Sequence, residues 1–251
     1  YMDGAAFGSV RGGDRDKMKR ELYIFSDIHG NSAAFSRFLK ADPPDGKKQY
    51  IFLGDLAGYY YDTAGCLAKL RRIPHLISVK GNHDECYIKS YEDLELTERL
   101  VEKYSSAYRD KDLGVLGYLK VLPVRKTITF GITEILIQHG SPDNPLEGRI
   151  YPDTVLPPYT DGKKRIILTG HTHYQMLRRE GNTVWLNPGS LGQPRDGKGF
   201  SYAVLSLEEE TGDMEVDFRT VSPDLAGLEQ EIKERDPDHP YLIEVLHRTR
   251  A

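Results

Sequence analysis

The stretch LYIFSDIHGNSAAFSRFLKADPPDGKKQYIFLGD, residues 22–55, decides the fold. It begins with an apolar, β-rich run that ends in Asp27, and it finishes with a second such run that ends in Asp55. Between them, residues 32–40 carry apolar side chains near helical spacing, and a Pro- and Gly-rich turn follows at 43–46. This strand–helix–strand order predicts a parallel or mixed sheet with helices packed against it.

The same alternation continues along the chain. We expect a helix over residues 64–72, a third strand over 75–82 and a β-hairpin over 126–140. Four further apolar runs predict strands at 165–173, 182–190, 200–210 and 214–221.

Four segments have a different character. The charged, amphipathic stretch 86–122 predicts two helices inserted between strands. Residues 141–164 form a long Pro- and Gly-rich loop, and such loops in compact domains are often functional. Residues 223–249 predict two short C-terminal helices. Residues 1–17 have no periodicity and no apolar signal-peptide core, so we interpret them as a flexible arm or a remnant of cloning.

Composition sets the broad class. The 251 residues are 39% hydrophobic and 29% charged, which suffices for a substantial core. A net charge of −4 gives no strong signal for nucleic acid or an anionic membrane, and no apolar run approaches the ~20 residues of a membrane span. Cys66 and Cys86 cannot form a disulfide framework in so long a chain, so we expect both reduced in a cytoplasmic protein. The oligomeric state is left open.

Polar clusters follow several of the predicted strands and contain five of the eight histidines. In open α/β sheets the crevice beyond the carboxyl ends of the strands is where ligands bind. Glycines beside these clusters allow tight turns and close approach of the backbone to a ligand. The clusters are Asp27-Ile28-His29, Gly54-Asp55, Gly81-Asn82-His83-Asp84, His139-Gly140 and Gly170-His171-Thr172-His173.

The side chains in these clusters suit a pair of metal ions. Carboxylate, imidazole and amide oxygen form a mixed N/O set that fits Mn, Fe, Zn, Ni or Co, and we favour Mn. Two ions bridged by a carboxylate can clamp the attacking and leaving oxygens of a displacement at phosphorus. Any single Asp here would more simply cap a helix, and a lone His would be an ordinary buried polar residue. It is the joint occurrence of five clusters in order that favours the metal site.

The motifs SDIHGN, GDLAG, GNHD, HGSP and GHTH, followed by NPGSLGQPRDG, resemble the calcineurin-like metallophosphoesterase superfamily. The likeness runs from about Leu22 to Val221 and is greatest to the small bacterial and archaeal phosphodiesterase branch. It implies an α/β fold of two packed, mostly mixed sheets flanked by helices, an αββα sandwich with the metal site at the C-terminal strand ends. Residues 18–222 would form the metallophosphoesterase domain, with the insert at 86–122, and 223–251 a helical extension of that domain.

The resemblance also implies a role for each ligand. A hydroxide held between two ions would attack phosphorus, and Asp55 would bridge the ions. Asp27, His29 and His173 would bind the first ion, whereas Asn82, His139 and His171 would bind the second.

Further residues are expected to face the substrate. By the resemblance, His83 would stabilise the phosphoryl oxygens or protonate the leaving oxygen. We expect Asp84 to take part in catalysis by orienting His83 and raising its pKa. Asn31 and Arg195 are candidates for contact with substrate phosphate. The run of tyrosines from Tyr59 to Tyr61 is interpreted mainly as packing, with base stacking as the alternative.

The function predicted is that of a dinuclear-metal-dependent phosphodiesterase acting on a small phosphate ester or a nucleotide. The alternatives are a phosphomonoesterase and a dinucleoside-polyphosphate hydrolase. The protein phosphatase pattern GDxVDRG with RGNHE is not matched, because Gly58 replaces its second acid and Lys80 its arginine. A non-catalytic scaffold is disfavoured, since none of the seven expected ligand positions departs from the pattern.

Overall fold

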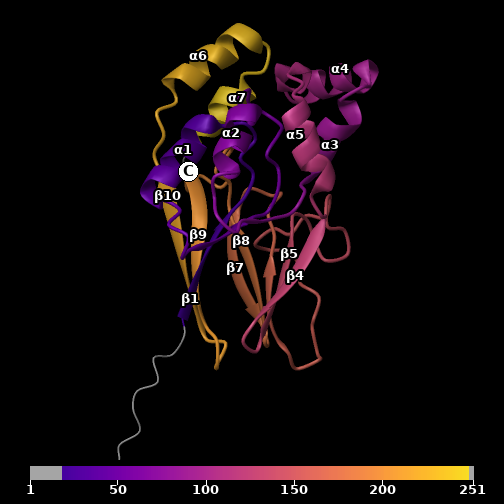
Figure 1. The fold of residues 1–251 in the computed structure, drawn as a ribbon. Coiled ribbons are helices and arrows are strands. Elements are labelled where there is room, and N and C mark those ends of the chain that lie inside the picture. The colour runs from indigo at the N-terminus through magenta and orange to yellow at the C-terminus, as the bar shows by residue number, and fades with distance from the viewer. Residues whose placement is uncertain (1–18, 249–251) are drawn as a thin grey trace, which may run out of the picture.

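Two five-stranded sheets lie at the centre of the described part of the chain, residues 19–248 of a computed structural model (Figure 1). The first sheet has the strand order β10-β9-β1-β2-β3 and the second β4-β5-β6-β8-β7. Both are mixed. In the first sheet β10, β9 and β1 pair antiparallel, whereas β1, β2 and β3 pair parallel. In the second sheet the parallel pairs of β5, β6 and β8 are flanked by antiparallel pairs at both edges. The strands are β1 (Lys19–Phe25), β2 (Gln49–Phe52), β3 (Ile77–Ser78), β4 (Arg125–Phe130), β5 (Thr133–Gln138), β6 (Lys164–Leu168), β7 (Gln175–Glu180), β8 (Thr183–Pro188), β9 (Phe200–Glu208) and β10 (Met214–Val221).

The helices gather at one end of the molecule, at the top of Figure 1, above the ends of the strands. They are α1 (Ser32–Ala41), α2 (Thr63–Leu70), α3 (Asn82–Ser90), α4 (Leu94–Lys103), α5 (Leu113–Val121), α6 (Ala226–Arg235) and α7 (Tyr241–Glu244), with 3₁₀ turns η1 (Ser106–Arg109) and η2 (Val245–His247). The predicted α/β fold of two packed mixed sheets with helices is confirmed.

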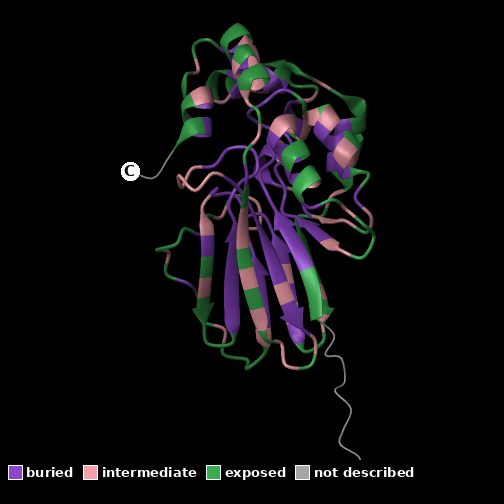
Figure 2. Ribbon diagram, turned by 90° about the vertical axis from the view of Figure 1, so that its left-hand side faces the viewer, coloured by how far each residue is buried: buried purple, intermediate pink, exposed green. Residues whose placement is uncertain are grey.

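Period-two alternation packs the first sheet on both faces. In β1, Leu22 and Ile24 face the second sheet and join a shared core cluster with Ile135 and Ile137 of β5. Tyr23 and Phe25 point to the opposite side, where the Phe25 ring lies 5.0 Å from that of Phe38 on α1. Figure 2 shows this burial as purple strands, together with strands in which pink, partly buried residues and green, exposed residues follow one another.

The second sheet is covered on its outer face by the long loop between β5 and β6. Ile150 and Leu156 of that loop form a cluster with Ile167, Met176 and Trp185 of the sheet. A segment without regular structure is thereby anchored beside the ends of the strands.

Three local predictions need correction. The insert holds three helices and a 3₁₀ turn instead of two helices, because a helix already begins at Asn82, on a predicted ligand. The third strand is only Ile77–Ser78. Strand β7 was not predicted, because it is a polar edge strand whose alternation is masked by Arg178, Arg179 and Glu180.

The C-terminal helices pack on the rest of the chain through apolar side chains and one buried carboxylate. Ile232 of α6 and Leu242 of α7 belong to the same core cluster as α1 and α2. Asp236 accepts hydrogen bonds from the Tyr61 hydroxyl at 2.7 Å and from the backbone N–H and hydroxyl of Ser106.

The expectation of a flexible arm or a remnant of cloning at residues 1–17 lies outside the residues that the structure describes.

Candidate metal centre

All seven predicted ligands meet where the strands of both sheets end. Asp27 and His29 follow β1, Asp55 follows β2, and Asn82 begins α3, which follows β3. From the second sheet, His139 follows β5, and His171 and His173 follow β6. Each of the seven side chains is buried, with at most 6% of the residue exposed. The predicted gathering of these side chains at the strand ends is therefore observed, and it draws on segments next to both sheets.

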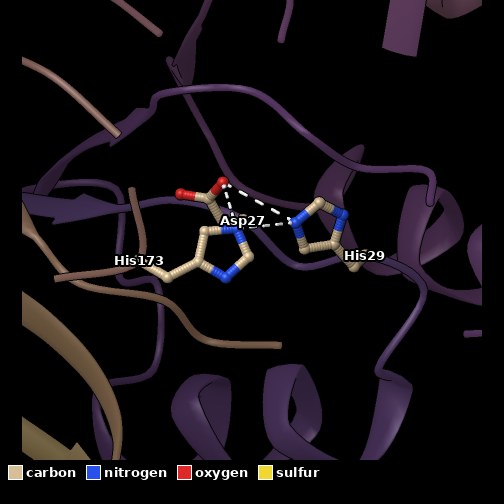
Figure 3. A group of neighbouring side chains, drawn as sticks. All are labelled: Asp27, His29 and His173. Carbon is tan, nitrogen blue, oxygen red and sulfur yellow. Dashed lines mark hydrogen bonds and ion pairs between the residues drawn. The ribbon is translucent and has the colours of Figure 1, made fainter. Parts of the chain in front are cut away.

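The first group of ligands is Asp27, His29 and His173, whose side chains point toward one another (Figure 3). The Oδ1 atom of Asp27 lies 3.2 Å from Nε2 of His173 and 3.7 Å from Nε2 of His29, and the two Nε2 atoms are 3.1 Å apart. These spacings match three donors around one small cation.

The second group is Asp55, His139 and His171, with Asn82 beside it. Nε2 of His139 lies 3.2 Å from Oδ2 of Asp55 and 3.0 Å from Oδ1 of Asn82. The same Oδ2 atom of Asp55 is 3.7 Å from Nε2 of His29 in the first group. Asp55 therefore stands between the two groups, as a bridging ligand must.

The backbone at the ligands adopts a conformation that side chains other than glycine rarely take. Asp27, His29, Asp55, His171 and His173 all have φ between +50° and +65°. Such a conformation costs roughly 1–2 kcal/mol per residue, although Asp and His tolerate it better than bulky residues. Strained backbone of this kind gathers at functional sites, where the surrounding structure holds it in place. Its presence at five of the seven candidate ligands therefore supports a functional site here.

Two glycines make room for the ligands. A Cβ atom at Gly81 would lie 2.0 Å from Oδ1 of Asp55, and one at Gly58 would lie 2.4 Å from Nδ1 of His29. Any larger residue at either position would displace a ligand.

Hydrogen bonds to backbone carbonyls set the tautomers of three of these histidines. Nδ1 of His29, His139 and His173 lies 2.9, 2.8 and 2.6 Å from the backbone carbonyls of Ala57, Leu53 and Gln193, respectively. A carbonyl only accepts, so each Nδ1 carries a proton. In the neutral ring Nε2 then has a free lone pair that points into the centre.

The residues present fit a pair of cations. Oδ1 of Asp27 and Oδ2 of Asp55 are buried without a hydrogen-bond partner among the described residues, and both face the histidine Nε2 atoms. Their companion oxygens are held by backbone N–H groups, Asp27 Oδ2 by His171 and Asp55 Oδ1 by His83. Electron-rich atoms packed this closely repel one another unless positive charge lies between them.

Burial and neighbouring charges shift the pKa values of three of the histidines in the two groups. Burial, with the neighbouring positive charges of His139 and Arg195, lowers the pKa of His171 to about 3 and of His173 to about 4. Burial would also lower the pKa of His139, but the negative charges of Asp55 and Asp27 outweigh it and raise the value to about 9. At neutral pH His139 therefore carries a proton on both ring nitrogens, whereas His171 and His173 are neutral.

The predicted pairing of Asp84 with the His83 ring is wrong. The Asp84 carboxylate accepts hydrogen bonds from the backbone N–H groups of Asp55, Leu56, Ala57 and Gly81 at 2.8–3.1 Å. Those four donors saturate it, so Asp84 holds the loop after β2 against the start of α3. The ring of His83 is bonded instead to a tyrosine of the insert, Tyr108.

The two predicted phosphate contacts differ in outcome. Asn31 is fully buried, where its Oδ1 caps α1 at Ala34 and its Nδ2 donates to the Gly192 carbonyl. Its expected substrate contact is therefore replaced by a structural role. Arg195 remains a candidate, because its guanidinium lies beside the first group and is held by Gln193 and the Tyr59 hydroxyl.

Sequence reasoning missed Arg149. Its Nε donates to Nε2 of His171 at 3.1 Å, which places a cation at the edge of the second group. Arg149 also lines a cavity of about 830 Å³ formed by residues 141–159 of the long loop, with Ile150 and Tyr159 among its walls. The only signal in the sequence was the length and composition of that loop.

The tyrosine run has the packing role expected of it. Tyr60 is fully buried and donates to the Leu242 carbonyl, and Tyr59 and Tyr61 are also buried. Within residues 19–248, no helix has the length and apolar character needed to cross a bilayer.

Comparison with known proteins places these features in a wider group. The model of the calcineurin-like phosphoesterase superfamily domain matches residues 21–210. An uncharacterized protein of Methanocaldococcus jannaschii, MJ0912, is 25% identical over 88% of this chain and 96% of its own length. The phosphodiesterase YfcE of Escherichia coli K12 is 23% identical over 74% of this chain and 86% of its own. The structure of a metallophosphoesterase from Sphaerobacter thermophilus superposes with a TM-score of 0.68 and 25% identity, covering 93% of this chain and all of that one.

Proposed function

Because the chain belongs to the calcineurin-like phosphoesterase superfamily, we propose that it hydrolyses phosphodiester bonds in small substrates with the help of two divalent metal ions. The observation that carries this proposal is the pair of adjacent candidate ligand groups. In them, carboxylate oxygens that accept no hydrogen bond among residues 19–248 lie 3.2 Å from histidine Nε2 atoms. Asp27, His29 and His173 hold the first ion in this proposal. Asp55 is shared, and the second ion takes Asn82, His139 and His171.

Two ions bound there would make water nucleophilic near neutral pH and would neutralise charge on the phosphoryl oxygens. The mixed imidazole, carboxylate and amide set suits a transition metal, and we favour manganese. Both cysteines are free thiols, in keeping with the reducing cytoplasm that we propose as the location.

The chain's own residues bind and orient the phosphate. Burial and the neighbouring histidines hold the pKa of His83 well below its usual value, although Asp55 opposes this, so the ring is neutral at physiological pH. A neutral imidazole acts here as a hydrogen-bond donor to a phosphate oxygen whose charge grows in the transition state. Arg195 lies beside the first group and Arg149 beside the second. Both provide N–H donors for the other oxygens of the phosphate.

Preference for diesters rests on two lines of support. The motif set is most similar to the phosphodiesterase branch, and a relative matched over three quarters of the chain is named a phosphodiesterase. A phosphodiester also carries one ester group that remains after hydrolysis. The cavity beside Arg149 offers such a group space next to the centre.

A rate comparison on matched substrates tests the proposal. The metal-reconstituted protein is assayed with bis-p-nitrophenyl phosphate, p-nitrophenyl phosphate, a cyclic nucleotide and diadenosine tetraphosphate. We expect turnover of the diester to exceed that of the monoester at least tenfold. Preference for the monoester or the tetraphosphate by orders of magnitude would overturn the diester assignment.

Single-site variants test whether turnover depends on the candidate metal centre. Asp55→Ala should abolish turnover, because it removes the shared ligand. His247→Gln is the matched control and should leave the rate unchanged. His247 is an exposed histidine whose side chain, among residues 19–248, is hydrogen-bonded to Glu229 alone. Wild-type turnover in the Asp55→Ala protein would contradict the metal-centre assignment.

A further inference from the structure

The ring of His83 is enclosed by aromatic residues, two of which come from the helical insert. Its centroid lies 4.9 Å from Tyr59, 4.6 Å from Tyr104 and 6.2 Å from Tyr108, and 4.9 Å from the ligand His29. The closest polar contact is 2.6 Å, between Nδ1 of His83 and the hydroxyl of Tyr108 in η1. Both residues are buried, with 5% and 1% of their surface exposed.

The direction of this hydrogen bond follows from the surroundings of the hydroxyl. No second partner for the Tyr108 oxygen is found among residues 19–248, so its proton is satisfied only if it is donated to Nδ1 of His83. The reverse arrangement would bury an unsatisfied O–H group, which costs roughly 1–3 kcal/mol. When Nδ1 accepts, the proton of the neutral His83 ring sits on Nε2.

Gly58 leaves space for this arrangement. A Cβ atom at Gly58 would lie 3.2 Å from Nδ1 of His83, on the side where the loop after β2 passes the ring. Because glycine stands there, the loop supplies no side chain to Nδ1. The insert reaches that nitrogen instead.

We propose that Tyr108 is a positioning residue: its hydroxyl locks His83 in the Nε2–H tautomer and fixes the ring orientation, so that Nε2 donates to the substrate phosphate. The helical insert is then part of the active site and not only a packing element. This inference rests on the proposed function of His83 as a hydrogen-bond donor.

The tautomer can be measured without any turnover. Long-range ¹H–¹⁵N spectra of uniformly ¹⁵N-labelled, zinc-loaded protein report which imidazole nitrogen carries the proton, with His83 assigned by comparison with His83→Gln. We expect Nε2–H in the wild type and a mixture of tautomers in Tyr108→Phe. An Nδ1–H ring in the wild type, or an unchanged tautomer in Tyr108→Phe, would overturn the proposal.

Kinetics on bis-p-nitrophenyl phosphate provide the second measurement. Tyr108→Phe should lower kcat about tenfold with KM within twofold, because only the transition-state contact is weakened. The same substitution in a His83→Ala background should add no further loss, since Tyr108 acts only through His83. Additive losses in the double variant would show a merely structural role.

Tyr87→Phe is the matched control for loosening of the insert. Tyr87 is another buried tyrosine of the insert, and its hydroxyl is bonded to the backbone of Asp110 and Asp112, away from His83. It should retain the wild-type tautomer and kcat, whereas an equal loss in both variants would contradict the proposal. Absence of diester turnover in the wild type would refute the proposed function alone, because the tautomer measurement would still decide the role of Tyr108.

Discussion

Individual ligand residues are held by contacts that the motif letters do not reveal. Nδ1 of His29, His139 and His173 donates to a backbone carbonyl in each case, and this hydrogen bond leaves Nε2 facing the candidate centre. Five of the seven candidate ligands also have positive φ angles, in the segments directly after the strands that precede them. The motifs thus single out the candidate ligands, but the orientation of these three histidine rings depends on backbone carbonyls of segments distant in the sequence.

His139 makes metal binding dependent on pH. Its pKa of about 9 in the metal-free protein exceeds the value near 6.5 of an unfolded chain. The ionic contact with Asp55 therefore stabilises the metal-free fold fully below about pH 6.5, and this contribution is lost as the pH rises through about 9. An ion needs the Nε2 lone pair, so loading at pH 7.5 should release about one proton from His139.

Calorimetric titration with Mn²⁺ in two buffers of different ionisation enthalpy measures this release. Its control is the same titration well above pH 9, where His139 is already neutral and the release should vanish. Equal proton release at both pH values would contradict the assignment to His139.

At the scale of elements, Asp84 joins the loop after β2 to the first turn of α3. Its four backbone donors belong to both segments, and the same turn presents Asn82 and His83 to the centre. A negative charge at the N-terminus of a helix is further favoured by the helix dipole. Asp84 therefore contributes to the site by fixing two elements relative to each other.

Replacing Asp84 by Ala should destabilise the protein by about 3 kcal/mol or more, because several buried N–H groups lose a charged acceptor. Urea unfolding followed by circular dichroism measures this loss. Asp93→Ala is the matched control, since Asp93 caps α4 through a single bond to Leu96 at an exposed site and should cost only about 1 kcal/mol. Similar losses in both variants would argue against a linking role for Asp84.

For the molecule as a whole, the candidate metal centre spans the junction of the two sheets. Asp27, His29, Asp55 and Asn82 come from segments next to the first sheet, whereas His139, His171 and His173 come from the second. The sheets already share an apolar core that includes Ile24 and Ile137. Ions bound at one end of this interface would hold together the two halves of the sandwich.

Metal removal should consequently lower the thermal stability of the entire domain. A ligand at 100 times its Kd stabilises the native state by about 2.7 kcal/mol, which corresponds to roughly 5–10 °C in Tm for a chain of this size. Differential scanning calorimetry with Mn²⁺ and with EDTA measures the change. His173→Ala should reduce the difference, and an EDTA effect of equal size in that variant would argue against binding at the first group.

By itself, the sequence determined the class of fold and singled out the candidate ligands. Strand alternation and apolar periodicity are local properties, and the motif order places the polar clusters at successive strand ends. The tertiary structure alone decided what surrounds them. The Asp84 carboxylate is bonded to backbone N–H groups and not to His83, and Asn31 caps helix α1. Tyr108 of the insert contacts His83, and Arg149 of the long loop contacts His171. Apart from the cap at Ala34, these contacts join residues 22 or more positions apart. They depend on side-chain packing in three dimensions, which no local pattern encodes.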